Sequence, residues 1–387
     1  MSDVDVIVIG LGSMGGAAAN TLAQRGLSVL GLERFWPSHD RGSAHGGTRI
    51  IRQSYYEGVE YVPLLLRAYE GWRRLEEQSE QKLVTITGGI YIGDPDEETF
   101  TGALRSARQW DLPHEVLSSA EITARFPAMR PADHAVGLFE ANAGFVNPEA
   151  TTAANIRVAT EHGARLHFGE AVRSWTATRG GGVEVVTEHG TYGADRLVVA
   201  PGAWSAQLLG EVGAPVASER QVMYWFEPGY SPGRPVFEDY AVGRQPVFIE
   251  RTDGNEQVYG FPIADGPGGG IKIGFFHEER PTDPDAVDRA VLPFEVARMQ
   301  SRALDLFPHL TGRLIDAKTC LYPSAPDDHF MIGLHPEHSQ VTIATGFGGH
   351  GFKFVPVIGE IAADLSTRGR TDLAIDLFAV DRPALQG

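Results

Sequence analysis

The length, composition and charge of this chain describe a globular protein and exclude several classes of partner. With 387 residues, 42% of them hydrophobic and 21% charged, the chain is too long for one compact core and has the balance of an ordinary soluble protein of two domains. Its formal net charge of −17 leaves no basic footprint, so we expect neither nucleic acid nor an anionic membrane as a partner.

The opening residues and the cysteine count indicate a cytoplasmic protein. The start "MSDVD" is acidic and the following apolar run "VIVIG" is too short for a signal peptide. No apolar run approaches the roughly 20 residues of a membrane helix. Cys320 is the only cysteine, which excludes an internal disulfide and points to a reducing compartment.

The first predicted elements are a strand, a tight turn, a helix and a second strand. The runs "VDVIVIG" and "LSVLGLE" are apolar, as in parallel strands buried on both faces. Between them Gly10, Gly12 and Gly15 form a G-x-G-x-x-G turn, which lets a pyrophosphate approach the start of a helix. Glu33, at the end of the second strand, can bind the ribose hydroxyls. This unit predicts a site for adenosine diphosphate, with a purely structural turn as the alternative, and does not distinguish NAD from FAD.

The remaining chain alternates between α/β and β-rich segments. Helices are predicted over 59–79 and from about residue 148, where apolar or small residues recur at helical spacing. Short alternating runs from about Val84, and again over 220–325, favour antiparallel strands. Residues 340–366 return to a strand, a glycine-rich turn and a helix. We therefore expect two interleaved domains rather than two consecutive ones.

Two later glycine-containing turns favour FAD over NAD. The strand in "LVVAPGAWS" ends near Gly202, and the C-terminal "ATGFGGHGFKF" contains four glycines, Gly346, Gly348, Gly349 and Gly351. Both could approach a long dinucleotide closely, whereas a nicotinamide enzyme has no obvious need for contacts so far from the N-terminal unit. Each turn taken alone is equally an ordinary loop.

Five cationic side chains are candidates for an anion-binding site: His45, Arg49, Arg52, Lys272 and Lys353. Arg49 and Arg52 are three residues apart and would share a helix face, and arginine suits a bidentate grip on a carboxylate. Lys272 and Lys353 lie in the apolar runs "GIKIGFF" and "GFKF". The alternatives are a solvated basic face for the arginines and lysines that snorkel to the surface.

Several longer motifs carry a resemblance to a known family. They are, in chain order, "VIVIGLGSMGGAAA", "GGTRIIRQSY", "VYGFP", "IKIG", "KTCLYPSAPDDHFMIGLHPEH" and "GFGGHGFKF". On these motifs the chain resembles the monomeric sarcosine oxidase and N-methyltryptophan oxidase family across essentially its whole length.

The resemblance implies a fold and a cofactor. The expected architecture is α/β, with a Rossmann-like FAD-binding domain of the glutathione-reductase type interleaved with a β-rich antiparallel substrate domain. The FAD-binding domain would comprise residues 1–87, 147–219 and 326–387, and the substrate domain 88–146 and 220–325. The family precedent implies a monomer, and no metal site is expected.

The resemblance also implies a reaction. The family oxidises secondary amino acids, so the substrate would be an N-methyl amino acid such as sarcosine or N-methyltryptophan, or a cyclic amino acid. The amine passes a hydride equivalent to flavin N5, the imine hydrolyses, and oxygen reoxidises the flavin to give hydrogen peroxide. In the family the cysteine matching Cys320 carries FAD through a thioether to the flavin 8α-methyl; a buried structural thiol is the alternative.

Roles for the cations and tyrosines follow from the same match. Arg52 and Lys353 would hold the substrate carboxylate, Arg49 and His45 would flank the flavin, and Lys272 would promote the reaction with oxygen. Tyr259 and Tyr322 match pocket tyrosines, or are ordinary half-buried aromatics. The residues expected to bind the cofactor are Gly10, Gly12, Ser13, Met14, Gly15, Glu33, Arg34, Ser43, Arg49, Gly202, Cys320, Gly346, Gly348, Gly349, His350, Gly351 and Lys353.

One departure from the family pattern concerns the substrate pocket. After the oxygen-activating lysine the family reads K-[LI]-G-x-H, whereas this chain places Phe276 in the histidine register and His277 one residue later. A slip of one residue sends a strand side chain to the opposite face. Either a bulge returns His277 to the site, or Phe276 makes the pocket more aromatic and less basic, which would suit a bulky or apolar amine.

Two other functions are compatible with these residues. One is a flavin dehydrogenase or biosynthetic imine-forming oxidase that acts on a non-standard amine, and peroxide release in air separates the dehydrogenase from an oxidase. The other is a non-catalytic FAD-binding subunit, which would have no use for Cys320, Lys272 or the pair Arg49 and Arg52.

Overall fold

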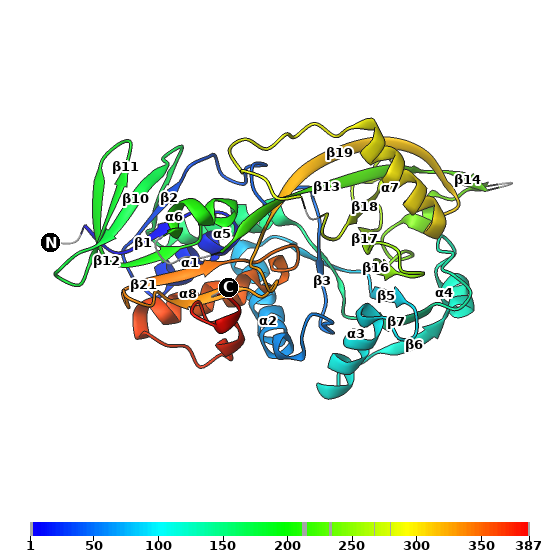
Figure 1. Cartoon of the computed structure of the whole chain (residues 1–387), viewed down its shortest axis with the longest axis horizontal. Coiled ribbons are helices and arrows are strands. Elements are labelled where there is room, and N and C mark those ends of the chain that lie inside the picture. The colour runs from blue at the N-terminus through cyan, green and yellow to red at the C-terminus, as the bar shows by residue number, and fades with distance from the viewer. Residues whose placement is uncertain (1–2, 211–214, 232–233, 267, 279, 386–387) are drawn as a thin grey trace.

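The computed structural model describes residues 3–210, 215–231, 234–266, 268–278 and 280–385, which form two parts, each built on a large sheet (Figure 1). In the first sheet the order is β10-β11-β12-β1-β2-β9, with β21 beside the C-terminal end of β12 and β20 beside β21. The strands are β1 Val4–Ile9, β2 Val29–Glu33, β9 Arg165–Phe168, β10 Val172–Ala177, β11 Val183–Thr187, β12 Thr191–Val199, β20 Met331–Leu334 and β21 Val341–Thr345.

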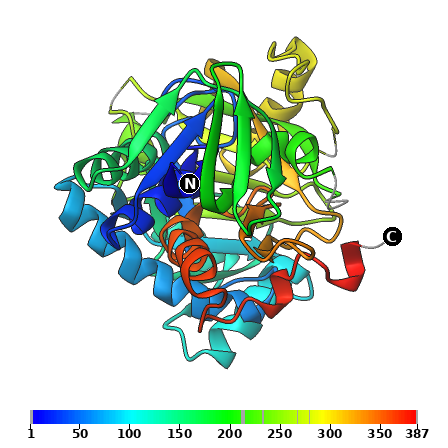
Figure 2. The same cartoon turned by 90° about the vertical axis from the view of Figure 1, so that its left-hand side faces the viewer.

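Small residues let the helices of the first part pack closely. Helix α1 (Ser13–Gln24) lies between α5 (Pro148–Glu161) and α8 (Val355–Arg368), and α2 (Val62–Ser79) packs on α5 and α8. A Cβ atom at Gly359 of α8 would lie 2.7 Å from the carbonyl oxygen of Ala17, so only glycine permits this approach to α1. Figure 2 shows these helices grouped beside the first sheet.

The second sheet is largely antiparallel, in the order β19-β13-β18-β17-β16-β5-β7-β6, with one parallel pair between β16 and β5. Its strands are β5 Gly89–Gly93, β6 Glu115–Ser118, β7 Val136–Glu140, β13 Ala217–Pro228, β16 Val247–Arg251, β17 Val258–Phe261, β18 Ile271–Phe275 and β19 Leu310–Ser324. Helices α3 (Glu98–Gln109), α4 (Ser119–Arg125) and α7 (Pro293–Leu306) pack against it. The long strands β13 and β19 extend from this sheet toward the first part (Figure 1).

A small sheet, β3-β8-β4, lies beside the two large ones. Its strands are β3 Arg49–Ile51, β4 Val84–Ile86 and β8 Gly144–Val146; the remaining short elements are β14 Tyr230–Ser231, β15 Arg234–Pro235 and α6 Ser205–Leu208. The shared helix face expected for Arg49 and Arg52 is therefore wrong. Ile50 and Ile51 are β-branched residues that pair with Phe145 and Gly144 of β8, and this pairing outweighs the helical spacing of two charges.

The α/β fold class and the interleaving of the two sheets along the chain are confirmed, as are the helices predicted at 59–79 and from 148. The first sheet takes its strands from three separate segments, and the second of these is followed, after α6, by the long β13 of the second sheet. The residue boundaries of the two domains stay a prediction. No helix within the described ranges is long and apolar enough to cross a membrane.

Candidate cofactor cleft and active site

The turn between β1 and α1 has the geometry of a phosphate-binding loop. Gly10 has φ +84°, and a Cβ atom there would lie 2.5 Å from the carbonyl oxygen of Ala200; at Gly15 a Cβ atom would lie 1.8 Å from the Gly10 oxygen. At Gly12 a Cβ atom would meet no atom within 4 Å, so this backbone faces open space. No side chain caps the start of α1, which leaves its first N–H groups free for an anion. A pyrophosphate fits this turn.

Glu33 lies at the C-terminal end of β2 with its carboxylate turned toward the turn. Its Oε2 accepts a hydrogen bond from the Leu11 N–H at 2.8 Å and its Oε1 from the Phe35 N–H at 3.0 Å, while His39 Nε2 lies 3.5 Å from Oε1. Burial alone would raise the pKa of Glu33, but His39 and the two N–H groups hold it below its usual value. The carboxylate is therefore ionised and available for hydroxyl donors.

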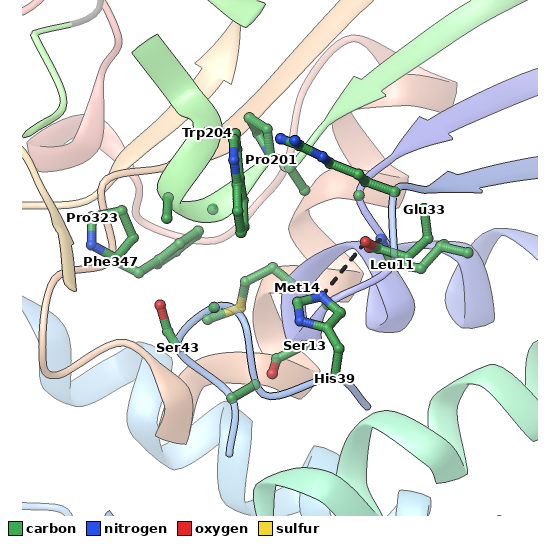
Figure 3. Close-up of a pocket in the computed structure, with 18 of the residues that line it drawn as sticks. Leu11, Ser13, Met14, Glu33, His39, Ser43, Pro201, Trp204, Pro323 and Phe347 are labelled. Carbon is green, nitrogen blue, oxygen red and sulfur yellow. Dashed lines mark hydrogen bonds and ion pairs between the residues drawn. The ribbon is translucent and has the colours of Figure 1, made fainter. Parts of the chain in front are cut away.

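An elongated cleft runs from this turn past the C-terminal ends of β12 and β21 (Figure 3). Figure 3 shows Trp204 across the cleft from Met14 and His39. The predicted cofactor residues that line it are Gly10, Gly12, Ser13, Met14, Glu33, Arg34, Ser43, Arg49, Gly202, Gly348, Gly349 and Gly351. Gly15 supports the turn from behind, and His350 and Lys353 line a second cavity instead. Gly346 and Cys320 are not among the residues of either cavity.

The second cavity is small, about 50 Å³, and shares Arg49, Tyr322, Gly349 and Phe352 with the cleft. It therefore opens beside the end of the cleft that is far from Glu33. Its remaining lining residues are aromatic, aliphatic or cationic apart from Glu57 and Gln257; they are Ile50, Arg52, Tyr56, Ile249, Tyr259, Phe261, Phe276, His350 and Lys353. An apolar cavity with convergent cations is suited to a small anionic molecule with an apolar portion.

Arg52 is the most enclosed of the cavity cations, with 3% exposure. Its guanidinium lies 4.0 Å from the ring centre of Tyr55 and 4.9 Å from that of Tyr56, and it donates to the carboxylate of Glu57 in a short ion pair. Burial would raise the pKa of Glu57, but Arg52 and the nearby His350 and Lys353 lower it, so the carboxylate is ionised. The guanidinium of Arg52, which was expected to bind a substrate carboxylate, is thus already paired with the carboxylate of Glu57.

Lys353 and His350 form the other side of this cavity. Lys353 Nζ donates to the His350 carbonyl oxygen at 2.6 Å, and His350 Nδ1 lies 2.6 Å from the Tyr55 hydroxyl. Burial, helped by the charge of Arg52, lowers the pKa of Lys353 well below its usual value, and burial lowers that of His350 to about 3. An anion in the cavity would favour the charged lysine.

Lys272 and His45 lie behind the cavity wall, and neither lines the cleft or the second cavity. Lys272 Nζ donates to the carbonyl oxygens of Gly46 and Thr48, both at 2.9 Å, and burial lowers its pKa well below the usual value. Burial is the largest cause that lowers the pKa of His45 to about 3, and the positive charge of Arg49 contributes next. Its Nε2 has no hydrogen-bond partner among the described residues.

Arg49 links the cleft to the second cavity. Its Nη1 donates to the Thr48 carbonyl oxygen at 2.8 Å and its Nη2 to the Ser43 carbonyl oxygen at 2.5 Å. The Tyr322 hydroxyl lies 3.5 Å from that of Tyr259, and burial raises the pKa of Tyr259 to about 12 and that of Tyr322 well above its usual value. Both phenols therefore remain neutral near physiological pH and can donate hydrogen bonds.

Cys320 lies on β19, two residues before Tyr322, and so on the same face of the strand as this cleft-lining ring. It is 1% exposed and packs with Met223, Trp225 and Tyr322. Burial raises the pKa of its thiol, while the charges of Arg49, Lys272 and Arg289 oppose that rise.

Phe276, not His277, faces the second cavity. His277 has a left-handed backbone with φ +60°, and its Nδ1 lies 3.3 Å from Glu219 Oε2, outside the cavity. Phe276 directly follows β18 (Ile271–Phe275), and by the alternation of a strand it continues the face of Lys272 and Gly274. The cavity is accordingly more aromatic than the family pattern implies.

Several residues that line the two cavities carry no signal in the sequence. Glu57 and Tyr56 follow Arg52 closely, but nothing in the sequence shows that they turn back onto it. Trp204 and Asp285 line the cleft from segments with no motif of their own, although Trp204 lies in the quoted run "LVVAPGAWS" beside Gly202.

Comparisons with known proteins agree with this geometry. A model of the FAD dependent oxidoreductase (DAO) family matches residues 5–365. The chain is 49% identical over 377 residues to the monomeric sarcosine oxidase of Streptomyces avermitilis, covering 97% of this chain and 96% of the relative. It is 35% identical over 386 residues to the N-methyl-L-tryptophan oxidase of Salmonella heidelberg, covering 98% of both chains.

Solved structures are similar over the whole chain. NikD, described as an unusual amino acid oxidase essential for nikkomycin biosynthesis, has a TM-score of 0.85 and 26% identity, covering 98% of both chains. The glycine oxidase of Geobacillus kaustophilus has a TM-score of 0.79 and 21% identity, covering 99% of both, and this likeness shows the fold alone. The chain is thus an FAD-dependent amine oxidoreductase, and it belongs to the family of monomeric sarcosine oxidase and N-methyl-L-tryptophan oxidase.

Proposed function

We propose that this protein oxidises a secondary amino acid in the second cavity, with FAD held in the cleft, attached through Cys320, and with oxygen as electron acceptor. The observation that carries the proposal is the convergence of Arg49, Arg52 and Lys353 on a small aromatic cavity that adjoins the cleft. Bound FAD would accept a hydride equivalent from the carbon next to the amine nitrogen and pass the electrons to oxygen, giving hydrogen peroxide.

Arg52 and Lys353 would bind the substrate carboxylate. Arginine offers two parallel N–H donors, and a carboxylate beside Lys353 would restore the charge that burial disfavours. Because the guanidinium of Arg52 is already paired with Glu57, the substrate carboxylate would have to displace the Glu57 carboxylate. This requirement selects for a carboxylate over a neutral group of the same shape.

The other polar residues would orient the substrate and stabilise the reduced cofactor. Tyr259 and Tyr322 would donate hydrogen bonds from neutral phenols, and Arg49 would place positive charge beside the reduced cofactor. Lys272 would act from behind the cavity wall, where the negative charge of the reduced cofactor and of reacting oxygen would favour its charged form. His45 would stay neutral in this setting. These assignments apply the family's roles to side chains that lie around one pair of connected cavities.

Cys320 is proposed as the attachment site for three reasons. It is the only cysteine of the chain, it lies on the face of β19 that borders the cleft, and three cations around it oppose the effect of burial on its pKa. Attachment would join its sulfur to the 8α-methyl carbon, with loss of the thiol proton and of one proton of the methyl group. The flavin would take up the two electrons of that oxidation and later pass them to oxygen.

Phe276 favours an amine with an apolar substituent. Its ring lines the cavity together with Ile249 and Phe261, where a histidine of the family pattern would be polar. We further propose a cytoplasmic monomer whose cofactor domain comprises residues 1–87, 147–219 and 326–387 and whose substrate domain comprises 88–146 and 220–325.

Peroxide formation tests the proposal. Purified protein in air would be supplied with sarcosine, N-methyl-L-tryptophan and L-proline, each beside its methyl ester, while oxygen uptake and hydrogen peroxide are measured. We expect one or more of the acids to give stoichiometric peroxide and the esters to give far less. Flavin reduction without peroxide would support the dehydrogenase instead, and no reduction by any amine would support a non-catalytic subunit.

A further inference from the structure

The connection between β18 and α7 crosses from the second sheet to the mouth of the cofactor cleft. In Figure 1 it is the yellow trace that leaves α7 and runs back along the top of the molecule. We call residues 281–290 the strap. Its start is fixed to β13, because Pro281 bridges Glu219 and the Thr282 N–H donates to the Ser218 carbonyl oxygen at 2.7 Å.

Asp285 fastens the middle of the strap to the cleft. Its Oδ1 accepts hydrogen bonds from Arg34 Nη1 at 2.7 Å and from Trp204 Nε1 at 2.8 Å, and its Oδ2 accepts from Gln207 Nε2 at 3.0 Å. All four residues line the cleft. Arg34 follows β2, whereas Trp204 and Gln207 follow β12, so one carboxylate joins the strap to two distant parts of the first sheet's framework.

The strap is shaped in advance to present this carboxylate. The Asp285 N–H donates to Asp283 Oδ1 at 2.9 Å, and the Ala286 N–H donates to the Asp283 carbonyl oxygen at 3.1 Å, which together form a tight turn with Pro284 at its centre. Farther along, Arg289 donates to the carbonyl oxygens of Asp40 and Arg41, the latter at 2.7 Å.

The position of the strap identifies the part of the cofactor beneath it. Arg34 directly follows Glu33, which ends β2 and whose carboxylate would bind the ribose of the adenosine. The adenine would therefore lie beyond Glu33, among Arg34, Trp204 and the strap. Arg34 also lies 5.7 Å from the Trp204 ring centre, so the pair forms one wall that Asp285 holds together.

We propose that the strap is part of the adenosine-binding site, and that Asp285 closes it over the adenine and thereby retains the cofactor. The Arg34–Asp285 pair alone would contribute little, since both side chains keep about two fifths of their surface exposed, 42% and 38%. The hydrogen bonds from Arg34, Trp204 and Gln207 together hold Asp285, and with it the strap, against the cleft. Retention of FAD before attachment to Cys320 would depend on them.

The test uses the Cys320→Ser chain, in which no cysteine remains and the flavin can be removed by dialysis against bromide. Flavin-free protein would be titrated with ADP, which occupies the adenosine end, and with FMN, which occupies the flavin end. Asp285→Asn keeps the shape of the side chain and removes its charge. Asp288→Asn is the matched control, because Asp288 lies in the same strap and its Oδ1 accepts only from the Ala290 N–H at 2.9 Å among the hydrogen bonds of its side chain in the described structure.

The expected result is an ADP dissociation constant raised about 5- to 30-fold by Asp285→Asn, with FMN binding unchanged and Asp288→Asn without effect. FAD loaded onto the Asp285→Asn chain should dissociate faster by a similar factor. Unchanged ADP affinity would overturn the proposal. An equal loss for FMN would show a general unfolding, and tighter ADP binding would show that Asp285 acts only by repelling phosphate; either result also overturns it.

Discussion

Replacing Glu57 by glutamine should tighten the binding of carboxylates in the second cavity. The guanidinium of Arg52 is 3% exposed, and its immediate acidic partner is Glu57. A carboxylate ligand must displace this partner, whereas a glutamine amide competes through a neutral hydrogen bond alone. The substitution leaves Arg52 with an acceptor, so the fold should be retained, unlike a change to alanine that would leave a buried charge unpaired.

The size of the effect follows from the loss of one charge beside Arg52. Two unit charges about 4 Å apart interact by about 4 kcal/mol at an effective dielectric constant of about 20, and the remaining neutral hydrogen bond recovers about 1 kcal/mol. A net gain of about 1 to 3 kcal/mol corresponds to an affinity about 5- to 150-fold higher.

The assay is a titration of the visible flavin absorbance with acetate and, separately, with acetamide. Acetate should bind more tightly to the Glu57→Gln protein, and acetamide should not. Glu60→Gln is the control, since Glu60 is exposed three residues farther along and carries the same charge. Weaker or unchanged acetate binding in Glu57→Gln would show that Glu57 supports the carboxylate site rather than blocking it.

Four further substitutions test separate parts of the site. Cys320→Ser should leave flavin that acid precipitation releases into the supernatant, whereas yellow colour that stays in the pellet would refute attachment at Cys320. Lys272→Met should slow the reaction of the reduced protein with oxygen by about 10²- to 10³-fold and change reduction by the amine little; equal slowing of both would refute its role. Phe276→His should raise kcat/KM for sarcosine relative to N-methyl-L-tryptophan, and an unchanged ratio would remove Phe276 from specificity. Burial opposes the charged form of His277, but Glu219 raises its pKa above the usual value, so the stability that this pair adds is complete below the unfolded pKa and falls as the pH rises through the folded one. Asparagine tolerates a left-handed backbone, so His277→Asn should flatten the pH dependence of the melting temperature. An unaltered slope of melting temperature against pH would contradict the pairing of His277 with Glu219.

The adenosine end of the cleft was predictable from the sequence because its chemistry is local. A strand, Gly10, Gly12, Gly15, a helix and an acid at the end of the next strand follow one another within 33 residues. Two of these glycines have a backbone reason in the structure: a Cβ atom at Gly10 would meet the Ala200 carbonyl oxygen, and one at Gly15 would meet the Gly10 carbonyl oxygen. The alternation of α/β and β-rich texture likewise predicted two interleaved sheets.

Contacts between distant segments were not predictable in the same way. Arg49 lies on a strand and not on the expected helix, because residues 49–51 pair with β8, whose residues lie nearly 100 positions farther along the chain. Asp285 reaches Arg34 across 251 positions, and no local pattern marks it. The side on which His277 lies depends on its own left-handed backbone, which the residue types alone leave open.

The most direct test of the central claim is anaerobic mixing of the purified protein with candidate amines while the visible flavin absorbance is followed. A secondary amino acid should bleach the flavin in a single turnover, and its methyl ester should do so far more slowly. Admitting oxygen should restore the colour with release of peroxide. Flavin that no secondary amino acid reduces, or that esters reduce as fast as acids, would contradict the assignment of this cavity to a carboxylate-bearing amine.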